Sequence, residues 1–336
     1  MPPGIARKDP VPRLSILIPA LGDCFELTLA SVLQHQPDDS EVLVVHSQPY
    51  DDPYHLSGDV CFVPMLHATQ TVELLNTGFE AARSGIVHVV QSGLEVTTGW
   101  TDEVEELFDD EQVATVAPVI VDAETGDRVW SAGLGYSRFG SSYPNAAGRA
   151  ISGRHPLPEN IIGPTQAAGF YRRSWWRLVR WNETLGDDFA DTHFNLTLAA
   201  LGATTRLARH CILSSVEPQG LAVDRPFGFS TARLAERLFW SHRRHAASWS
   251  AIGLRTAYML AESVLALPSH RSITGLLGRI AGLLDRTSAA AFQSHVAELS
   301  TRLAEEHALA ESSTTLSFDA ARKHRSPSAA TKKRAA

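Results

Sequence analysis

The segment LLNTGFEAARSGIVHVVQSG, residues 74–93, holds the pattern that decides the fold. Its first half belongs to a stretch, 68–85, that predicts a helix closed by a glycine. Its second half is a short run of apolar, mostly β-branched residues, which predicts a buried strand at 86–91. Gln91, Ser92 and Gly93 form the turn at the end of this strand. Since ligands in α/β proteins bind at the carboxyl ends of strands, this turn is the first candidate site.

Strands alternate with helices on either side of this segment. Several of the strands are apolar on both faces, as in a parallel sheet that helices cover on both sides. The pattern predicts an α/β domain with a Rossmann-like sheet over about 13–220. Further strands are expected at 13–20, 41–47, 60–65 and 114–122, and further helices at 24–36, which Asp23 caps, and at 97–108.

The second half of this domain is less regular. Residues 128–150 are rich in Gly, Ser and aromatic residues, which suggests short antiparallel strands and loops over one end of the sheet. A strand running into a helix is expected at 166–179, and a helix that Gly202 ends at 189–202. A closing strand is expected at 204–213.

The composition changes after the sheet domain. Helical periodicity holds over about 226–311 and predicts a C-terminal α-helical extension of three or four helices. Residues 1–12 are proline-rich and residues 312–336 end in a basic, low-complexity stretch, so both are expected to be disordered.

Charge and cysteine content exclude some classes of protein. The 336 residues carry a formal net charge of -7, which argues against nucleic acid as a partner. The three cysteines, Cys24, Cys61 and Cys211, are far apart and form no metal-binding spacing. A reducing, cytoplasmic compartment is therefore expected.

The sequence shows no signal peptide and no membrane span. The most apolar stretch, 249–268, is interrupted by Arg255 and Glu262 and ends at a proline, so we expect a buried helix there. This leaves peripheral association open, at the inner face of the membrane. The basic group His242, Arg243, Arg244 and His245 either lies on a solvated helix face or contacts phosphate or acidic lipid.

Seven segments, taken in order, resemble a family 2 glycosyltransferase of the GT-A fold. GFYRRSWW and VWSAGLGYSRFG are similar to the acceptor side of its rhamnosyltransferase-like members. The resemblance covers about 13–215 and rests on the order of RLSILIPALGD (13–23), LTLASVLQHQPDDSEVLVVHS (27–47), LLNTGFEAARSGIVHVV (74–90), LEVTTGW (94–100), VWSAGLGYSRFG (129–140), GFYRRSWW (169–176) and FADTHFNLTLAALG (189–202).

The resemblance implies an enzyme that uses a nucleotide-sugar donor and transfers the sugar by a single inverting displacement. A glycan or lipid-linked acceptor, as in the synthesis of cell-envelope polysaccharide, is the implied partner. In such enzymes a D-x-D motif holds a divalent metal on the donor diphosphate. A carboxylate deprotonates the acceptor hydroxyl.

The chain departs from that family at the metal motif. The D-x-D position falls on Gln91, Ser92 and Gly93, which supply no carboxylate. Amide and hydroxyl oxygens bind Mg²⁺ or Mn²⁺ mainly beside carboxylates, so no metal ligand is assigned and the cofactor is left open. Glu95 is the nearest acid in sequence and either faces the same cleft or lies in solvent.

The chain departs from the family a second time, at a position on the donor side. His46 stands where the family often has an aspartate that holds the nucleoside. It either stacks on a base or donates to phosphate, or only satisfies nearby backbone groups. By position, the donor-side group also includes Pro19, Ala20, Leu21, Asn76 and Gly78, the glycine being equally consistent with close helix packing.

Asp191 is the candidate catalytic base. Aligning Gly202 with the glycine that ends the family's helix places Ala190 and Asp191 on its Glu-Asp pair, so one of the two acids remains. The alternative is an acid that interacts with the helix macrodipole. On the acceptor side, Arg172 with Trp175 and Trp176 offers a cation and an aromatic wall, or else an arginine beside core tryptophans.

Two functions from different classes follow. The first is an active glycosyltransferase with an atypical metal site. The second is an inactive glycosyltransferase-like domain that binds a nucleotide or sugar, or docks a partner. Neither a GxGxxG nor a GxxxxGK[ST] motif follows the first strand, which argues against dinucleotide or P-loop chemistry.

Overall fold

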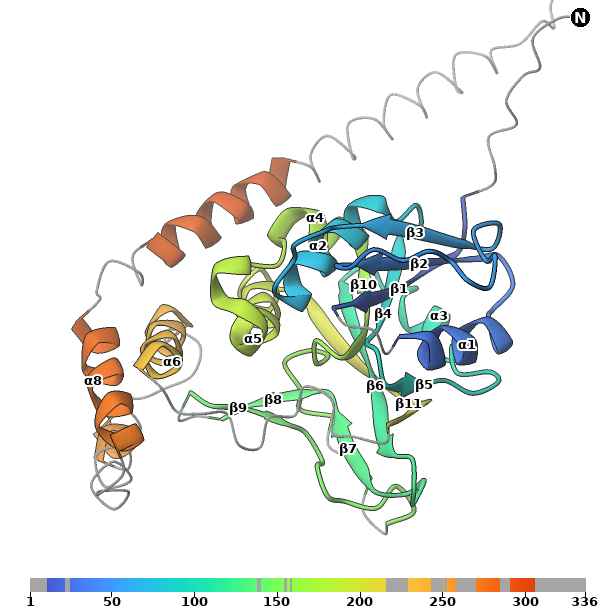
Figure 1. Ribbon diagram of the computed structural model, residues 1–336. Helices are drawn as coiled ribbons and strands as arrows, with labels where there is room; N and C mark the ends of the chain where they lie inside the picture. Colours follow the sequence, from blue (N-terminus) through green and yellow to red (C-terminus); the bar gives the residue numbers. More distant parts are fainter. Residues whose placement is uncertain are drawn as a thin grey trace, which may run out of the picture.

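A computed structural model of the chain describes residues 11–21, 25–137, 140–153, 156–157, 159–215, 229–242, 250, 253–257, 270–284 and 291–305 (Figure 1). Several predictions lie outside these residues, namely the cap at Asp23, the basic residues 243–245, most of residues 1–12, and the tail from 312. The predicted domain limits at 220 and 226 also fall in such a segment, 216–228.

A nine-stranded sheet forms the centre of the molecule. Its strand order is β3-β2-β1-β4-β10-β6-β11-β5, and β7 pairs with β6 outside this path. The predicted strands are present as β1 (Leu14–Ala20), β2 (Ser40–His46), β3 (Val60–Pro64), β4 (Ile86–Val90), β6 (Val113–Asp122), β10 (Ala168–Arg172) and β11 (Thr204–Ser215).

The sheet is mixed, where the sequence predicted a parallel one. Strands β3, β2, β1 and β4 run parallel, as do β6 and β11. Between these two groups β10 runs antiparallel to both β4 and β6. A run of apolar residues does not report the direction of a strand, which is why the sequence did not reveal this inversion.

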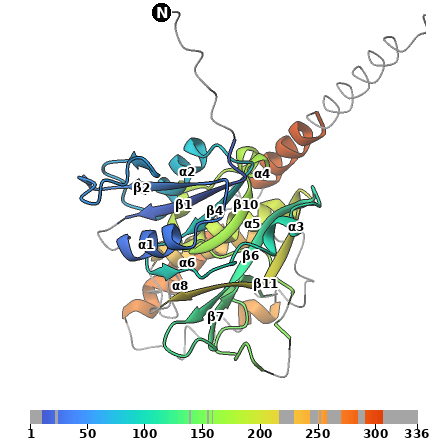
Figure 2. The ribbon, with the colours of Figure 1, turned by 90° about the vertical axis from the view of Figure 1, so that its right-hand side faces the viewer.

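Helices cover both faces of the sheet, as predicted (Figures 1 and 2). Side chains of β1 alternate between the faces: Ile16 and Ile18 belong to one buried cluster and Leu17 to the other. The first cluster lies under α1 (Glu26–Gln34) and α3 (Val104–Leu107). The second lies under α2 (Thr71–Ala81), α4 (Arg173–Val179) and α5 (Gly186–Ala200).

Two short elements differ from the prediction. The helix expected at 97–108 is reduced to the four residues of α3, because turns occupy most of the preceding segment. Two residues, Leu94 and Glu95, form β5, which pairs with the end of β11. The irregular region does contain short strands, β7 (Val129–Ala132), β8 (Leu134–Tyr136) and β9 (Ser142–Pro144), with β8 and β9 antiparallel.

The C-terminal region is helical wherever it is described. It contains α6 (Phe229–His242), residues 253–257, α8 (His270–Leu284) and residues 291–305. Helix α6 packs on α5 and on α8. Arg255 is buried and forms a two-fold hydrogen-bonded ion pair with Glu236 of α6. Among the described helices, none has both the length and the apolar content to cross a bilayer.

Candidate functional site

The carboxyl ends of three parallel strands meet at one edge of the sheet. Ala20 at the end of β1 is in register with His46 at the end of β2, and β4 ends beside them at Val90. Strand β10 begins at the same edge, since Ala168 pairs with Val90. This is the edge where α/β proteins bind ligands, and we call it the carboxyl edge.

The turn after β4 is fixed by hydrogen bonds to its neighbours. The N–H of Gln91 donates to the carbonyl of Ala167 at 2.8 Å, and the hydroxyl of Ser92 donates to the carbonyl of Pro19 at 3.2 Å. The side chains of Gln91 and Ser92 are half-buried. The turn therefore presents an amide and a hydroxyl at the carboxyl edge.

Gly93 completes the turn in a conformation that favours glycine. Its φ of +90° lies in the left-handed region, and its N–H donates to Oγ1 of Thr28 at 2.9 Å. An aspartate or glutamate at this position would have a strained backbone conformation. This explains why the third position of the motif resists an acidic residue in this chain.

Gln166 places two carboxylates at the same edge. Its N–H donates to Oδ2 of Asp191 at 3.3 Å, and its side-chain Nε2 donates to Oδ1 of Asp187 at 2.8 Å. The other oxygen of Asp191 accepts from the N–H and the hydroxyl of Thr192, at 2.5 and 3.1 Å. Asp191 is only 6% exposed, so these bonds compensate for the loss of solvent around its carboxylate.

Asp187 was not identified from the sequence. Its two oxygens accept from the N–H groups of Thr71 and Val72, each at 2.9 Å, at the start of α2. Because the first N–H groups of a helix lack partners within the helix, this carboxylate caps α2 from α5. The signal in the sequence was an acidic pair after a glycine in GDD, 186–188, but its partner lies 115 residues away.

Residues 166 and 167 therefore join the two halves of the site. Ala167 accepts from Gln91, and the neighbouring Gln166 donates to Asp191. The sequence-predicted D-x-D position and the candidate base thus lie on either side of one two-residue segment. This segment links the turn after β4 to the candidate base Asp191.

His46 lies at the carboxyl edge within a small aromatic group. Its Nδ1–H donates to the carbonyl of Gln48 at 2.6 Å, and its ring centroid lies 6.3 Å from Tyr50 and 6.5 Å from Phe62. Burial raises the pKa of the Tyr50 phenol above its ordinary value of 10. The Nδ1 proton of His46 is thus bonded to a backbone carbonyl, in agreement with the alternative in which this histidine only satisfies nearby backbone groups.

The start of the first loop is tied to β2. The hydroxyl of Ser47 donates to the carbonyl of Leu21 at 3.0 Å, and the N–H of Ser47 donates to the carbonyl of Ala20. With Pro19 bonded to Ser92, three of the predicted donor-side residues, Pro19, Ala20 and Leu21, line the carboxyl edge through their backbone.

Asn76 and Gly78 lie further along α2, away from its first turn. The side chain of Asn76 donates to the carbonyl of Trp181 at 3.1 Å and to Glu183 at 2.7 Å. A Cβ added to Gly78 would lie 2.3 Å from Cδ1 of Leu17 in β1. These contacts support close packing of α2 on the sheet and on the segment before α5.

The predicted acceptor-side residues do not reach the carboxyl edge. Because β10 runs antiparallel to β4, Arg172 pairs with Ile86 at the opposite end of that strand. Its guanidinium donates to the carbonyls of Phe108, Asp110 and Val113. Trp175 and Trp176 are 8% and 1% exposed in the core cluster under α4. The structure does not bring these side chains together with Gln91 or Asp191.

Comparison with solved structures identifies the architecture. TarS from S. aureus, residues 1–349, matches with a TM-score of 0.50 and 12% identity over 89% of this chain and 92% of that one. GalNAc-T7 with UDP, GalNAc and Mn²⁺ matches with a TM-score of 0.51 and 10% identity over 74% of this chain. The chain has the GT-A fold. It spans 55% of the GalNAc-T7 chain.

A third structure is similar at a lower score. The mannosyltransferase PcManGT from Pyrobaculum calidifontis, in complex with GDP-Man and Mn²⁺, matches with a TM-score of 0.46 and 14% identity over 88% of this chain and 87% of that one. No protein-family profile matches the sequence, and neither does any curated protein. At these identities the comparisons show the GT-A fold and nothing narrower.

The position of the metal motif, Gln91 to Gly93, offers a divalent cation no carboxylate ligand. The side chains of Gln91 and Ser92 are neutral, and Gly93 has no side chain. In the described part of the chain, no three His, Cys, Asp or Glu side chains are grouped in a way that could hold a metal. Glu95 is exposed in β5, on the strand that pairs with β11. Gln91, Ser92 and Gly93 do not fit the metal that the resemblance implies, and we derive no step through one.

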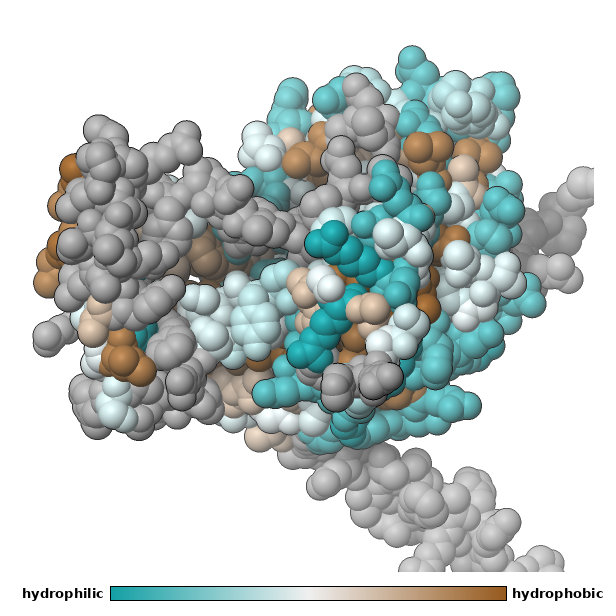
Figure 3. Space-filling model, turned by 90° about the horizontal axis from the view of Figure 1, so that it is seen from below, coloured by the Kyte–Doolittle hydropathy of each residue, from teal (hydrophilic) through white to brown (hydrophobic). Residues whose placement is uncertain are grey.

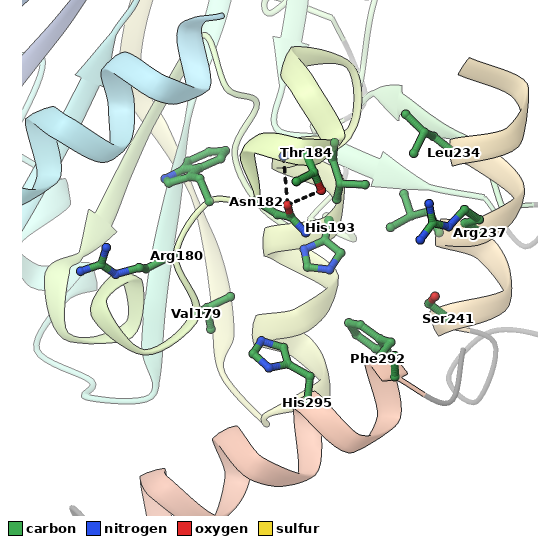
Figure 4. Close-up of a pocket in the computed structure, with 14 residues that line it drawn as sticks. Val179, Arg180, Asn182, Thr184, His193, Leu234, Arg237, Ser241, Phe292 and His295 are labelled. Atoms are coloured by element: carbon green, nitrogen blue, oxygen red, sulfur yellow. Dashed lines mark hydrogen bonds between the residues drawn. The ribbon is translucent and has the colours of Figure 1, made fainter. Parts of the chain in front are cut away.

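A cavity of about 490 Å³ lies between the GT-A domain and the C-terminal helices (Figure 4). In Figure 4, His193 of α5, Arg237 and Ser241 of α6 and Phe292 lie around it. Burial lowers the pKa of His193 to about 4, so this imidazole is neutral at pH 7. Asp191 instead bonds to Gln166 at the carboxyl edge, so the cavity is separate from the candidate site.

Proposed function

We propose that the protein is a glycosyltransferase that moves a sugar from a nucleotide-sugar donor to a glycan or lipid-linked acceptor. The GT-A fold supports this class of donor. The observation that carries the proposal is the segment Gln166–Ala167, which holds Gln91 and Asp191 at one edge of the sheet. Cell-envelope polysaccharide is the acceptor class that we infer from the family resemblance.

In the proposed reaction the donor lies over the ends of β1, β2 and β4. The backbone of Pro19, Ala20 and Leu21, with the ring of His46, forms the nucleoside side. Gln91 and Ser92 face the sugar diphosphate as hydrogen-bonding groups. Such fixed dipoles stabilise a leaving group only if they are aimed at the charge that develops on it.

Asp191 acts as the general base in this proposal. Its carboxylate takes the proton from the acceptor hydroxyl while that oxygen bonds to the anomeric carbon. The bond from the anomeric carbon to the diphosphate oxygen breaks, and the nucleoside diphosphate leaves with the electron pair. Attack on the face opposite the leaving group inverts the anomeric centre. The hydrogen bonds from Gln166 and Thr192 orient the carboxylate of Asp191.

A second candidate function is a catalytically inactive domain that binds a nucleotide or sugar, or docks a partner. The neutral Gln91 and Ser92 favour it, because a leaving diphosphate needs positive charge near it. The two carboxylates that Gln166 holds at this edge add negative charge instead. The two functions share a donor site and differ in whether a sugar is released.

Thermal unfolding with nucleotide sugars tests the donor site. We expect UDP-, GDP- or dTDP-linked sugars, with or without Mn²⁺, to raise the Tm, because a ligand that binds only the folded state stabilises it. A shift without Mn²⁺ supports a metal-free site. If no nucleotide sugar shifts the Tm with or without Mn²⁺, the proposed donor site is wrong, and the function of docking a partner is favoured.

Donor hydrolysis then separates the enzyme from the binder. Asp191→Asn should lower the rate at least tenfold, since it removes the base but retains the size of the side chain. Asp188→Asn is the matched control, because it removes a carboxylate three residues earlier on α5. Equal rates for wild type and Asp191→Asn would remove Asp191 from the mechanism. No hydrolysis by wild type, despite donor binding, would leave the inactive binder.

For cell localisation we propose the cytoplasm, with attachment to the inner face of the membrane. No span is needed for this, because peripheral attachment needs only a suitable surface. The basis in sequence is the wide spacing of Cys24, Cys61 and Cys211, which is typical of a reducing compartment.

A further inference from the structure

Helix α8 exposes five of its six large apolar residues and buries three glycines together with Arg279. Gly275, Gly278 and Gly282 are buried on its inner side. The outer side carries a row of aliphatic side chains, each at least 40% exposed (Figure 3). This arrangement is the reverse of an ordinary surface helix, which turns its apolar face to the core. The exposed residues are Ile273 (49%), Leu277 (53%), Ile280 (45%), Leu283 (40%) and Leu284 (76%).

The spacing of these residues makes one continuous surface. Ile273, Leu277, Ile280 and Leu284 follow at i, i+4, i+7 and i+11, which places them on one stripe of a helix. We call this stripe, with Leu283 beside it, the α8 apolar face. In Figure 3 apolar side chains gather along the outer edge of the C-terminal helices, on the side away from the sheet.

The packing of α8 on α6 fixes which side faces outward. A Cβ added to Gly282 would lie 2.8 Å from the carbonyl oxygen of Arg233 and 2.6 Å from Cβ of Glu236. Only glycine allows this close approach, so α8 cannot rotate to bury its aliphatic side without losing the contact. The exposure of the α8 apolar face is therefore built into the packing.

The charge of the chain indicates what covers this face. Residues 226–336 contain 15 Lys and Arg against 8 Asp and Glu, whereas residues 1–225 contain 15 against 29. An anionic surface attracts the region that carries α8 and repels the sheet domain. A symmetric dimer through the same face would bring two positively charged regions together, which disfavours it.

We propose that the α8 apolar face docks on an anionic phospholipid bilayer. The helix has 15 residues, so it is roughly 22 Å long. That is shorter than the hydrocarbon core of a bilayer, about 30 Å, so α8 lies along the interface and does not cross it. The aliphatic side chains enter the boundary between headgroups and acyl chains, and the net positive charge of residues 226–336 attracts the acidic headgroups. This inference does not depend on sugar transfer.

Co-sedimentation of the full chain with vesicles tests the proposal. The vesicles contain phosphatidylglycerol and phosphatidylcholine at about 3:7, a fraction high enough to give an anionic surface. Vesicles of phosphatidylcholine alone provide the comparison. We expect wild type to bind the anionic vesicles, and the double variant Leu277→Gln/Ile280→Gln to bind at least tenfold more weakly. Both positions are exposed, so the variant should keep its Tm.

Leu27→Gln/Leu66→Gln is the matched control, because it removes two exposed leucines from the sheet domain, 74% and 49% exposed. It should bind as wild type does. Three results overturn the proposal: no binding of wild type to anionic vesicles, equal binding by the α8 variant, or equal loss in both double variants. A fourth is a lipid-free wild-type dimer that the α8 substitutions convert to a monomer, since a second copy would then cover the face.

Discussion

Nε2 of Gln166 donates a hydrogen bond to Oδ1 of Asp187 at 2.8 Å. The same Asp187 carboxylate accepts from the first N–H groups of α2, so one side chain connects α2, α5 and the segment that leads into β10. Gln166 in turn donates its own N–H to Asp191. The position of the candidate base Asp191 therefore depends on Gln166 and, through Gln166, on Asp187. Neither of these two residues is proposed to contact the substrate.

Asp187→Ala should destabilise the fold by about 2 kcal/mol. The substitution leaves two N–H groups at the start of α2 and the amide of Gln166 without their acceptor, and loss of a helix N-cap alone costs roughly 0.5–2 kcal/mol. Urea unfolding at pH 7 measures the change. Asp188→Ala, one residue along α5, is the control and should cost less than half as much. Equal losses for both variants would show that the effect is general to acids at this helix end.

Gly78→Ala should destabilise the fold by about 1–3 kcal/mol, the usual range for overpacking a core. Its new methyl group would overlap Leu17, which is fully buried and has no room to move. Gly85→Ala is the control, because a Cβ there meets no atom within 4 Å. If Gly78→Ala keeps wild-type stability but loses the Tm shift with nucleotide sugars, the donor-side interpretation of Gly78 is favoured over packing.

The sequence contains the pattern of the parallel half of the sheet because β1, β2 and β4 are apolar on both faces. It does not contain the direction of β10, since alternation of side chains is the same for both directions of a strand. Strand β5 has two residues, which is too short for any periodicity to emerge. The GT-A fold was nevertheless predicted, because the order of several weak segments specified it together.

The residues of the candidate site also fall into two groups, those that the sequence predicted and those that only the structure revealed. Gln91, Ser92 and Asp191 were predicted as site residues from the family resemblance, and their roles stay predictions. Asp187 and Gln166 were not predicted, because their roles exist only once α2, α5 and the lead-in to β10 are in contact. The sequence predicted that Arg172 binds the acceptor. Because β10 runs antiparallel to β4, Arg172 instead lies at the end of β4 opposite the candidate site.

Glu236→Ala should destabilise the C-terminal helices by about 3–5 kcal/mol. Arg255 bonds to both oxygens of Glu236, at 2.9 and 3.0 Å, and both side chains are almost fully buried. Removing one partner leaves a buried charge without its counter-ion. Glu236→Leu/Arg255→Met should cost less than Glu236→Ala, because the pair is removed together. Thermal unfolding followed by far-UV circular dichroism measures both variants.

The exposed pair Arg302–Glu298 is the control for this prediction. Its side chains are 61% and 57% exposed, and exposed ion pairs contribute about 0–1 kcal/mol. Glu298→Ala should therefore leave the Tm within about 2 °C of wild type. A loss at Glu236→Ala no larger than this would mean that the buried pair does not stabilise the C-terminal helices.

His88 makes the stability of the sheet depend on pH. It is fully buried in β4, its Nδ1–H donates to the carbonyl of Gly169 at 3.0 Å, and its ring stacks on Phe170 at 3.6 Å. Burial lowers the pKa of His88 to about 3, from an ordinary value of 6.5. Below pH 6.5 the unfolded chain therefore takes up a proton that the folded chain excludes. The free energy of unfolding must fall as the pH falls from 6.5 towards 3.

Between pH 7 and pH 5 this single group should remove about 2 kcal/mol from the free energy of unfolding. His88→Phe retains the stacking on Phe170 and removes the titrating group, so it should lose about that much of the wild-type decline. Urea unfolding at the two pH values gives the difference. His210→Phe, at an exposed position in β11, should keep the full decline because His88 is intact. An unchanged decline in His88→Phe would mean that His88 is already protonated in the folded protein at pH 5, contrary to its burial.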